Sequence, residues 1–176
     1  MGLPLIVVLL IAAVVHARIR YPAVPGAMAE LLMIYVLVGY CGVQEIVMGA
    51  AILLTGGRVL VHFGFQPGQP TFVWDSFLLF GGGITSILAI WKRDSYLLAP
   101  VLLWSVFFAG ATYAHIQLNR ANGFPPTWQS TLGIFATHGL ISVLLISFYL
   151  ASQKYRARRT TPAQLLVGGR ASECNA

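Results

Sequence analysis

Four ionisable side chains interrupt otherwise apolar stretches of the sequence: Glu45, Asp75, His115 and His138. Such groups are rare inside apolar spans and usually face a bundle interior, so they indicate a functional site by default. Two imidazoles and two carboxylates could bind zinc, copper or iron, or could form a path for a proton or a small molecule. A structural interpretation also stays open, in which Glu45 bonds His138 and Asp75 bonds His115 across helices, each bond contributing about 1 kcal/mol.

No stronger chemical motif accompanies these four residues. The spacing of a zinc protease motif is missing, and the glycines at 81–83 lack the strand and the lysine of a phosphate loop. Cys41 and Cys174 lie far apart and form no CxxC pair. We therefore expect no catalytic residue and assign no cofactor. The sequence does not decide whether the protein is an enzyme, and nothing in it favours one.

The elements that must position these groups follow from composition. Hydrophobic residues make up 57% of the 176-residue chain and charged residues only 9%, which excludes an ordinary water-soluble domain. A bilayer core needs about 20 apolar residues per helix. The sequence therefore predicts an all-α, polytopic transmembrane helix bundle over residues 1–153, with a basic tail at 154–176 and these five spans: 2–18, 27–55, 72–91, 96–118 and 128–152.

The connections between spans indicate an orientation. The segment at 58–65 is too short to cross and is expected at the membrane interface. Positive residues concentrate after the first, third and fifth spans: Arg18, Arg20, Lys92, Arg93, Lys154, Arg156, Arg158 and Arg159. The other side has only Arg58 and Arg120. The positive-inside rule then places the N-terminus outside and the C-terminus in the cytoplasm.

This orientation also predicts depth. Glu45 and His138 would lie about 14–15 Å below the outer boundary, and Asp75 and His115 about 5 Å below it. All four groups would therefore share the outer half of the bundle. The first span carries its positive charges after the apolar stretch, which favours a retained helix, with a cleaved signal peptide as the alternative.

Glycines are expected to mediate helix packing. Small residues let helix backbones approach closely where lipid gives no hydrophobic drive between helices. The glycines that fall within the second and third spans are Gly39, Gly42, Gly49, Gly81, Gly82 and Gly83.

Several landmarks between Ala29 and Ile116 resemble a family of small bacterial integral membrane proteins of unknown function. They are Glu30 at the start of the second span, a Gly-Phe pair before a proline-containing loop at 64–70, Ile-Leu-x-x-Trp at 87–91, and Phe-x-x-Gly-Ala-x-Tyr-x-His-Ile at 107–116. The acidic residue of the third span, Asp75, is displaced by one position from the family's glutamate, and Glu45 has no counterpart there. The resemblance implies a five-helix or four-plus-one bundle and supplies no activity.

We therefore expect a non-catalytic accessory or structural subunit of a larger complex in a bacterial inner membrane. Its partners would be the lipid bilayer and either other protein subunits or further copies of this chain, and no nucleic acid. The alternative is a protein that handles a small molecule, a proton or a metal through the four buried ionisable groups.

Overall fold

The computed structural model describes residues 2–22, 26–63, 65–121, 123 and 133–154, and these residues are helical apart from short connections. Within them, five helices are long and apolar enough to cross a membrane: Leu3–Arg20, Ala27–Thr55, Thr71–Leu88, Ser95–Ala121 and Phe135–Lys154. The all-helical architecture with five apolar helices is confirmed. The start expected for the fifth span and the basic tail lie outside the described residues.

The helix ends follow local chemistry. Helix α1 (Gly2–Arg20) continues two residues past the expected end, because no breaker occurs before Pro22. Helix α3 (Glu45–Thr55) ends at Gly56, whose φ of 58° is left-handed. The short helix η2 (Arg58–Phe63) precedes α4 (Thr71–Leu88), and the short helix η3 (Asp94–Leu97) precedes α5 (Leu98–Ala121).

The second span is not a uniform α-helix. It begins as α2 (Ala27–Tyr35), continues as the π-helical η1 (Val36–Gln44) and ends as α3. A second π-helical stretch, η5 (Phe135–Gly139), opens the last span, which is α-helical at residues 140–154. A π-helix uses i→i+5 hydrogen bonds and is frequent at functional sites. Both π-helical stretches contribute to the site described below.

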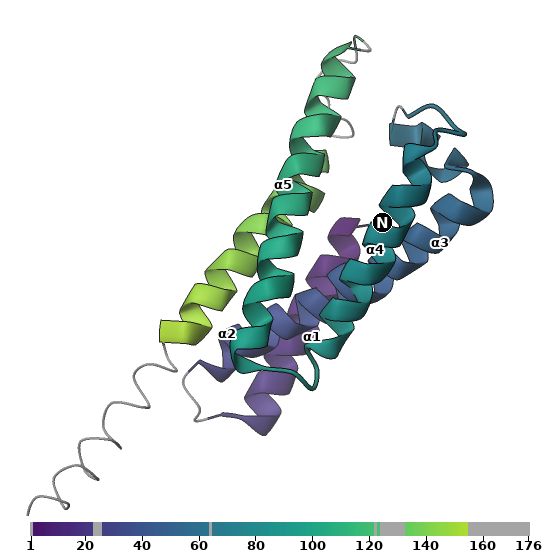
Figure 1. Cartoon of the computed structure of the whole chain (residues 1–176). Coiled ribbons are helices and arrows are strands. Elements are labelled where there is room, and N and C mark those ends of the chain that lie inside the picture. Colours follow the sequence, from purple (N-terminus) through teal and green to yellow (C-terminus); the bar gives the residue numbers. More distant parts are fainter. Residues whose placement is uncertain (1, 23–25, 64, 122, 124–132, 155–176) are drawn as a thin grey trace, which may run out of the picture.

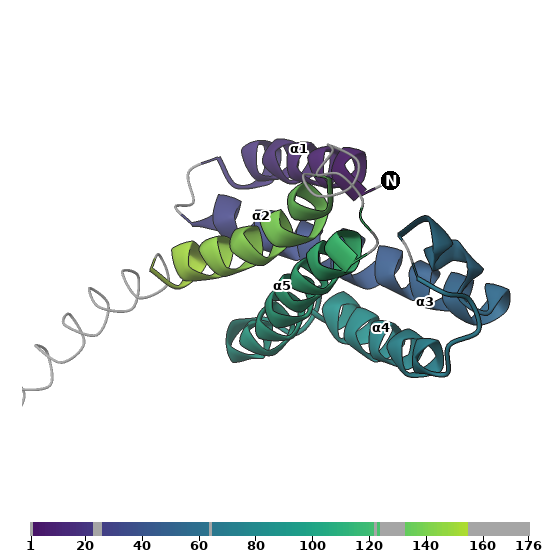
Figure 2. The ribbon, with the colours of Figure 1, turned by 90° about the horizontal axis from the view of Figure 1, so that it is seen from above.

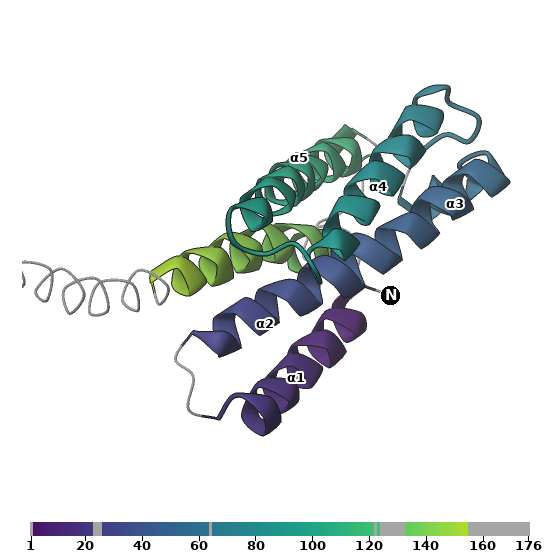
Figure 3. The same ribbon diagram turned by 60° about the horizontal axis from the view of Figure 1, so that its bottom comes forward.

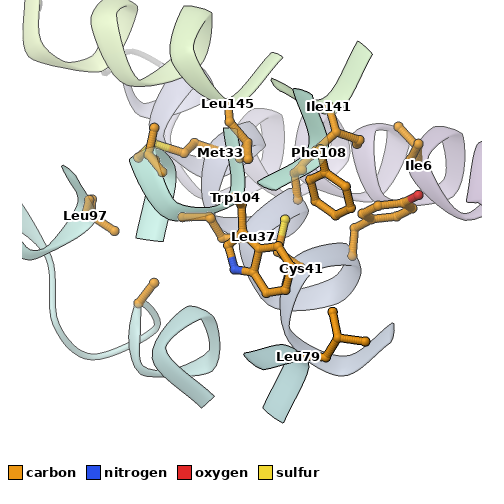
Figure 4. Packing of buried hydrophobic residues seen from close by; sticks show 14 of the residues in the cluster. Ile6, Met33, Leu37, Cys41, Leu79, Leu97, Trp104, Phe108, Ile141 and Leu145 are labelled. Carbon is orange, nitrogen blue, oxygen red and sulfur yellow. The ribbon is translucent and has the colours of Figure 1, made fainter. Parts of the chain in front are cut away.

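The second span is the centre of the bundle. Helix α1 packs along α2, and α4 packs along η1 and α3, while α5 packs against the last span (Figure 3). The start of the last span also reaches α1, as the view from above shows (Figure 2). The core lies between these helices, where Trp104 and Phe108 pack among Leu37, Cys41 and Leu145 (Figure 4).

Glycines sit where helices approach most closely. A Cβ built on Gly83 of α4 would lie 2.5 Å from Cγ1 of Ile46 and 3.0 Å from the carbonyl oxygen of Gly42 on the second span. On another side of α4, a Cβ on Gly82 would lie 2.7 Å from the ring of Trp104. Gly81 differs, since a Cβ there would meet nothing within 4 Å.

Polar side chains also join the helices. Trp104 on α5 donates from Nε1 to Oγ of Ser86 on α4 at 2.6 Å. Ser142 on the last span donates to the carbonyl of Ser105 at 2.9 Å, and Ser105 donates to the carbonyl of Ser142 at 3.5 Å. These buried bonds hold α5 between α4 and the last span, and so set the rotation of α5 about its axis.

Candidate functional site: a histidine pair between two spans

The structure brings His115 and His138 together inside the bundle. His115 lies on the inward face of α5, and His138 belongs to η5 at the start of the last span. Their ring centroids are 5.5 Å apart with an interplanar angle of 48°. His115 is only 9% exposed. The two imidazoles are therefore neighbours within the bundle, with His115 buried and His138 half-buried.

The orientation of His138 is set by its neighbour Thr137. The Thr137 hydroxyl donates to the carbonyl of Gly133 at 2.9 Å, and its Oγ1 lies 2.9 Å from Nδ1 of His138. A hydroxyl has one proton to donate. When that proton goes to Gly133, Oγ1 accepts from Nδ1–H of His138, and Nε2 keeps a lone pair that can accept a proton or bind a ligand.

Tyr40 connects the two π-helical stretches. This residue of η1 is 2% exposed, and its hydroxyl donates to the carbonyl of Thr137 at 3.2 Å. Its ring also packs on Phe108 at a centroid distance of 5.7 Å, and Phe108 in turn packs on His138 at 5.6 Å. Tyr40 thereby holds η5 at a fixed position against η1 and positions His138.

Aromatic rings enclose the histidine pair on both sides. Phe65, from the connection between η2 and α4, packs edge-on against His115 at 5.3 Å. Phe108 packs against His138 from the other side, and Trp104 stacks on Phe108 at 5.3 Å. The imidazoles thus lie within a row of aromatic ring contacts.

Two buried polar atoms lack a partner among the described residues, one on α5 and one on η1. Among the described residues, Nδ2 of Asn119 and Oε1 of Gln44 are buried and make no hydrogen bond. Asn119 lies one turn beyond His115 on α5 and is 7% exposed. Buried polar groups in folded proteins nearly always have a partner or an ordered water. These two atoms are therefore free to bond to a water molecule.

Glu45 is buried in the second span but does not bond to the histidines. It is 6% exposed at the start of α3, and within the described part of the chain its carboxylate forms no hydrogen bond or ion pair. No bond joins it to His138, whose described hydrogen bond is to Thr137. The predicted Glu45–His138 pair is thus not brought together as a bonded pair.

Asp75 lies away from the histidine pair. The buried side of α4 runs through Phe72, Ser76, Leu79 and Ser86, and Asp75 lies outside that stripe, on the exposed side. No bond between Asp75 and His115 occurs among the described residues. The one-position offset from Ser76 rotates Asp75 by about 100° around the helix, which explains why the expected pair does not form.

The described residues do not gather three or more His, Cys, Asp and Glu side chains into a potential metal site. The four predicted groups therefore separate into an adjacent histidine pair, a buried glutamate on the second span and an exposed aspartate on α4. Sequence analysis missed Asn119, although the 3–4 spacing of Thr112, His115 and Asn119 places all three on one helix face.

Charges divide between the two ends of the bundle. Nη1 of Arg93, in the α4–α5 connection, donates to Oε1 of Glu30 at the start of α2 at 3.3 Å. This ion pair places the α1–α2 and α4–α5 connections at one end, where the last span also ends (Figure 1). We call this end the basic end, and it carries Arg18, Arg20, Lys92, Arg93 and Lys154. The opposite end carries Arg58 and Arg120.

Comparison with known proteins gives a family without an assigned activity. No curated protein and no solved structure matches the chain. The expectation of a family of unknown function is confirmed, and the match extends well beyond residues 29–116. The chain belongs to the DUF6790 family of unknown function, whose model matches residues 1–159.

Proposed function

We propose that this chain is an integral membrane protein that crosses the bilayer five times, with its N-terminus outside and its C-terminus in the cytoplasm. Five apolar helices of sufficient length support the membrane location. The excess of positive residues at the basic end supports the orientation. The natural membrane for such a chain is the bacterial inner membrane. A reporter fused after Ala176 that proved to be external would overturn this orientation.

We further propose that the histidine pair accepts a proton that arrives from the outer end of the bundle. The close approach of two imidazoles inside the bundle carries this proposal, because imidazole gains and loses protons near neutral pH. Asn119 continues the polar face of α5 from His115 toward the end of that helix, about 6 Å further along its axis. This face is the route for the proton.

The other direction is closed by apolar packing. Beyond the reciprocal Ser105–Ser142 bonds, the interior is filled by Val101, Leu145 and Leu97, each at most 1% exposed. Among the described residues, a proton that reaches the pair therefore meets mainly apolar packing on the way to the basic end. The arrangement favours a proton-binding centre with access from one side over a pore through the membrane.

Nuclear magnetic resonance of protein labelled with ¹⁵N-histidine in nanodiscs tests this function. Two imidazolium ions 5.5 Å apart repel by about 3 kcal/mol at an effective dielectric constant near 20. The two rings are therefore expected to bind protons one after the other, and His138→Gln should alter the titration of His115. His16→Gln is the matched control, since His16 is hydrogen-bonded to Tyr35 near the C-terminal end of α1, away from the histidine pair.

Two results would contradict the proton proposal. One is a His115 titration that His138→Gln leaves unchanged. The other is a neutral His138 with its proton on Nε2 instead of Nδ1. Retention of zinc or copper through purification would favour the metal alternative, for which the described residues supply two imidazole ligands of the usual four.

An accessory role in a larger complex is the second candidate. It is supported by small residues on the outer face of the helices, where Gly81 on α4 and Gly110 on α5 have open space around them. Ala109 and Ala114 extend the face on α5. Such faces allow close helix contacts in membranes. Purification in mild detergent followed by native mass spectrometry tests this role, and a solitary monomer would contradict it.

A further inference from the structure

The basic end of the bundle carries more positive charge than the protein itself neutralises. Its acidic residues are Glu30 and Asp94, against the five cations named above. Glu30 is paired with Arg93. Among the described residues Arg18, Arg20 and Lys92 form no ion pair, and all three are exposed.

These three cations lie where lipid headgroups would surround a membrane-spanning bundle. Arg18 and Arg20 occupy the last turn of α1, and Lys92 directly follows the end of α4. Trp91 beside Lys92 is 69% exposed, and Tyr21 beside Arg20 is 43% exposed. Exposed Trp and Tyr rings favour the level of the headgroups. In the proposed membrane location the cations therefore lie beside an apolar, lipid-facing surface, at the depth of the phosphates.

We infer that the basic end binds the phosphate headgroups of anionic phospholipids through Arg18, Arg20 and Lys92. Arg18 and Arg20 lie on the last turn of α1 and Lys92 follows α4, so lipids bound at this end would contact both the end of α1 and the α4–α5 connection. This inference depends on the membrane location proposed above and is independent of the histidine pair. Each cation near a lipid surface contributes about a fivefold gain in affinity.

The test measures binding of phosphatidylglycerol to purified protein in neutral detergent, by native mass spectrometry or by titration with labelled lipid. In micelles the protein has no sidedness, so altered membrane orientation does not affect the result. Arg18→Gln/Arg20→Gln/Lys92→Gln should bind at least tenfold more weakly than the wild type. The control Arg58→Gln/Arg120→Gln removes two cations from the opposite end and should stay within about twofold of the wild type.

A second variant is expected to bind phosphatidylglycerol more tightly than the wild type, a result that misfolding would not produce. Glu30→Gln removes the partner of Arg93 and leaves that guanidinium available to a phosphate. Its affinity for phosphatidylglycerol should rise severalfold, and higher salt should weaken binding to every variant, because exposed charges are screened.

Three outcomes would overturn the inference. The first is a triple variant that binds phosphatidylglycerol as tightly as the wild type. The second is equal affinity of the wild type for phosphatidylcholine, which carries no net charge. The third is binding that is insensitive to salt or is weakened by Glu30→Gln.

Discussion

Replacement of Gly83 by alanine should destabilise the bundle where α4 crosses the second span closely. The added Cβ would lie 2.5 Å from Ile46 and 3.0 Å from the backbone oxygen of Gly42. Side chains can shift, but backbone can do so only if two helices separate. Overpacking of this kind costs about 1–3 kcal/mol, and the higher helix propensity of alanine offsets about 1 kcal/mol.

Gly81→Ala provides the matched control on the same helix. Nothing lies within 4 Å of a Cβ at that position, so only the gain in helix propensity of about 1 kcal/mol remains. Gly81→Ala should therefore be as stable as the wild type or more stable. The expected gap between the two variants is about 1–3 kcal/mol.

Unfolding of both variants in mixed micelles of mild detergent and dodecyl sulfate measures this gap. Adding Ile46→Ala to Gly83→Ala removes one of the two contacts and should recover part of the lost stability, as a coupling between neighbouring sites. Equal stability of Gly83→Ala and Gly81→Ala would refute the reasoning, because it would mean that α4 and the second span are not closely packed there.

Three further variants test other contacts. Tyr40→Phe removes the bond to the last span, so it should lower the free energy of unfolding by about 1 kcal/mol and change the nuclear magnetic resonance signals of His138. The control Tyr113→Phe, at a position 66% exposed, should do neither. Trp104→Phe loses its buried bond to α4 and leaves a cavity, so its melting temperature should fall by several degrees. The control Trp74→Phe, at a position 78% exposed, should melt at the same temperature as the wild type. Arg93→Gln breaks a partly exposed ion pair, and a double-mutant cycle with its partner should give a coupling below about 1 kcal/mol; a larger value would show a more buried pair.

Much of the fold followed from the sequence because apolar length alone decides which helices can span a membrane. The placement of Asp75 was also within reach, since the spacing of Phe72, Ser76 and Leu79 defines an inward stripe that excludes it. The depths assigned to the ionisable groups came from counting residues along each helix. Counting gives height along the axis but not rotation about it.

The histidine pair could not be predicted for this reason. His115 and His138 belong to different spans, and their meeting depends on how α5 and the last span rotate against each other. That rotation is set by side-chain contacts such as the Ser105–Ser142 bonds. The π-helical turns could not be predicted from the sequence either, because nothing in the composition of Val36–Gln44 distinguishes i→i+5 from i→i+4 hydrogen bonding.

The π-helical turn in the middle of the second span holds one residue more than an α-helical turn would, because its bonds run i→i+5 instead of i→i+4. Deleting one residue between Val36 and Gln44 should therefore let the backbone relax to ordinary α-helical bonding while Glu45 and Gly49 still face the interior. A deletion within α3 has no such turn to absorb it and would rotate the residues after it by about 100°. Relatives with one residue fewer in the π-helical turn are therefore expected to keep the same interior side chains on α3.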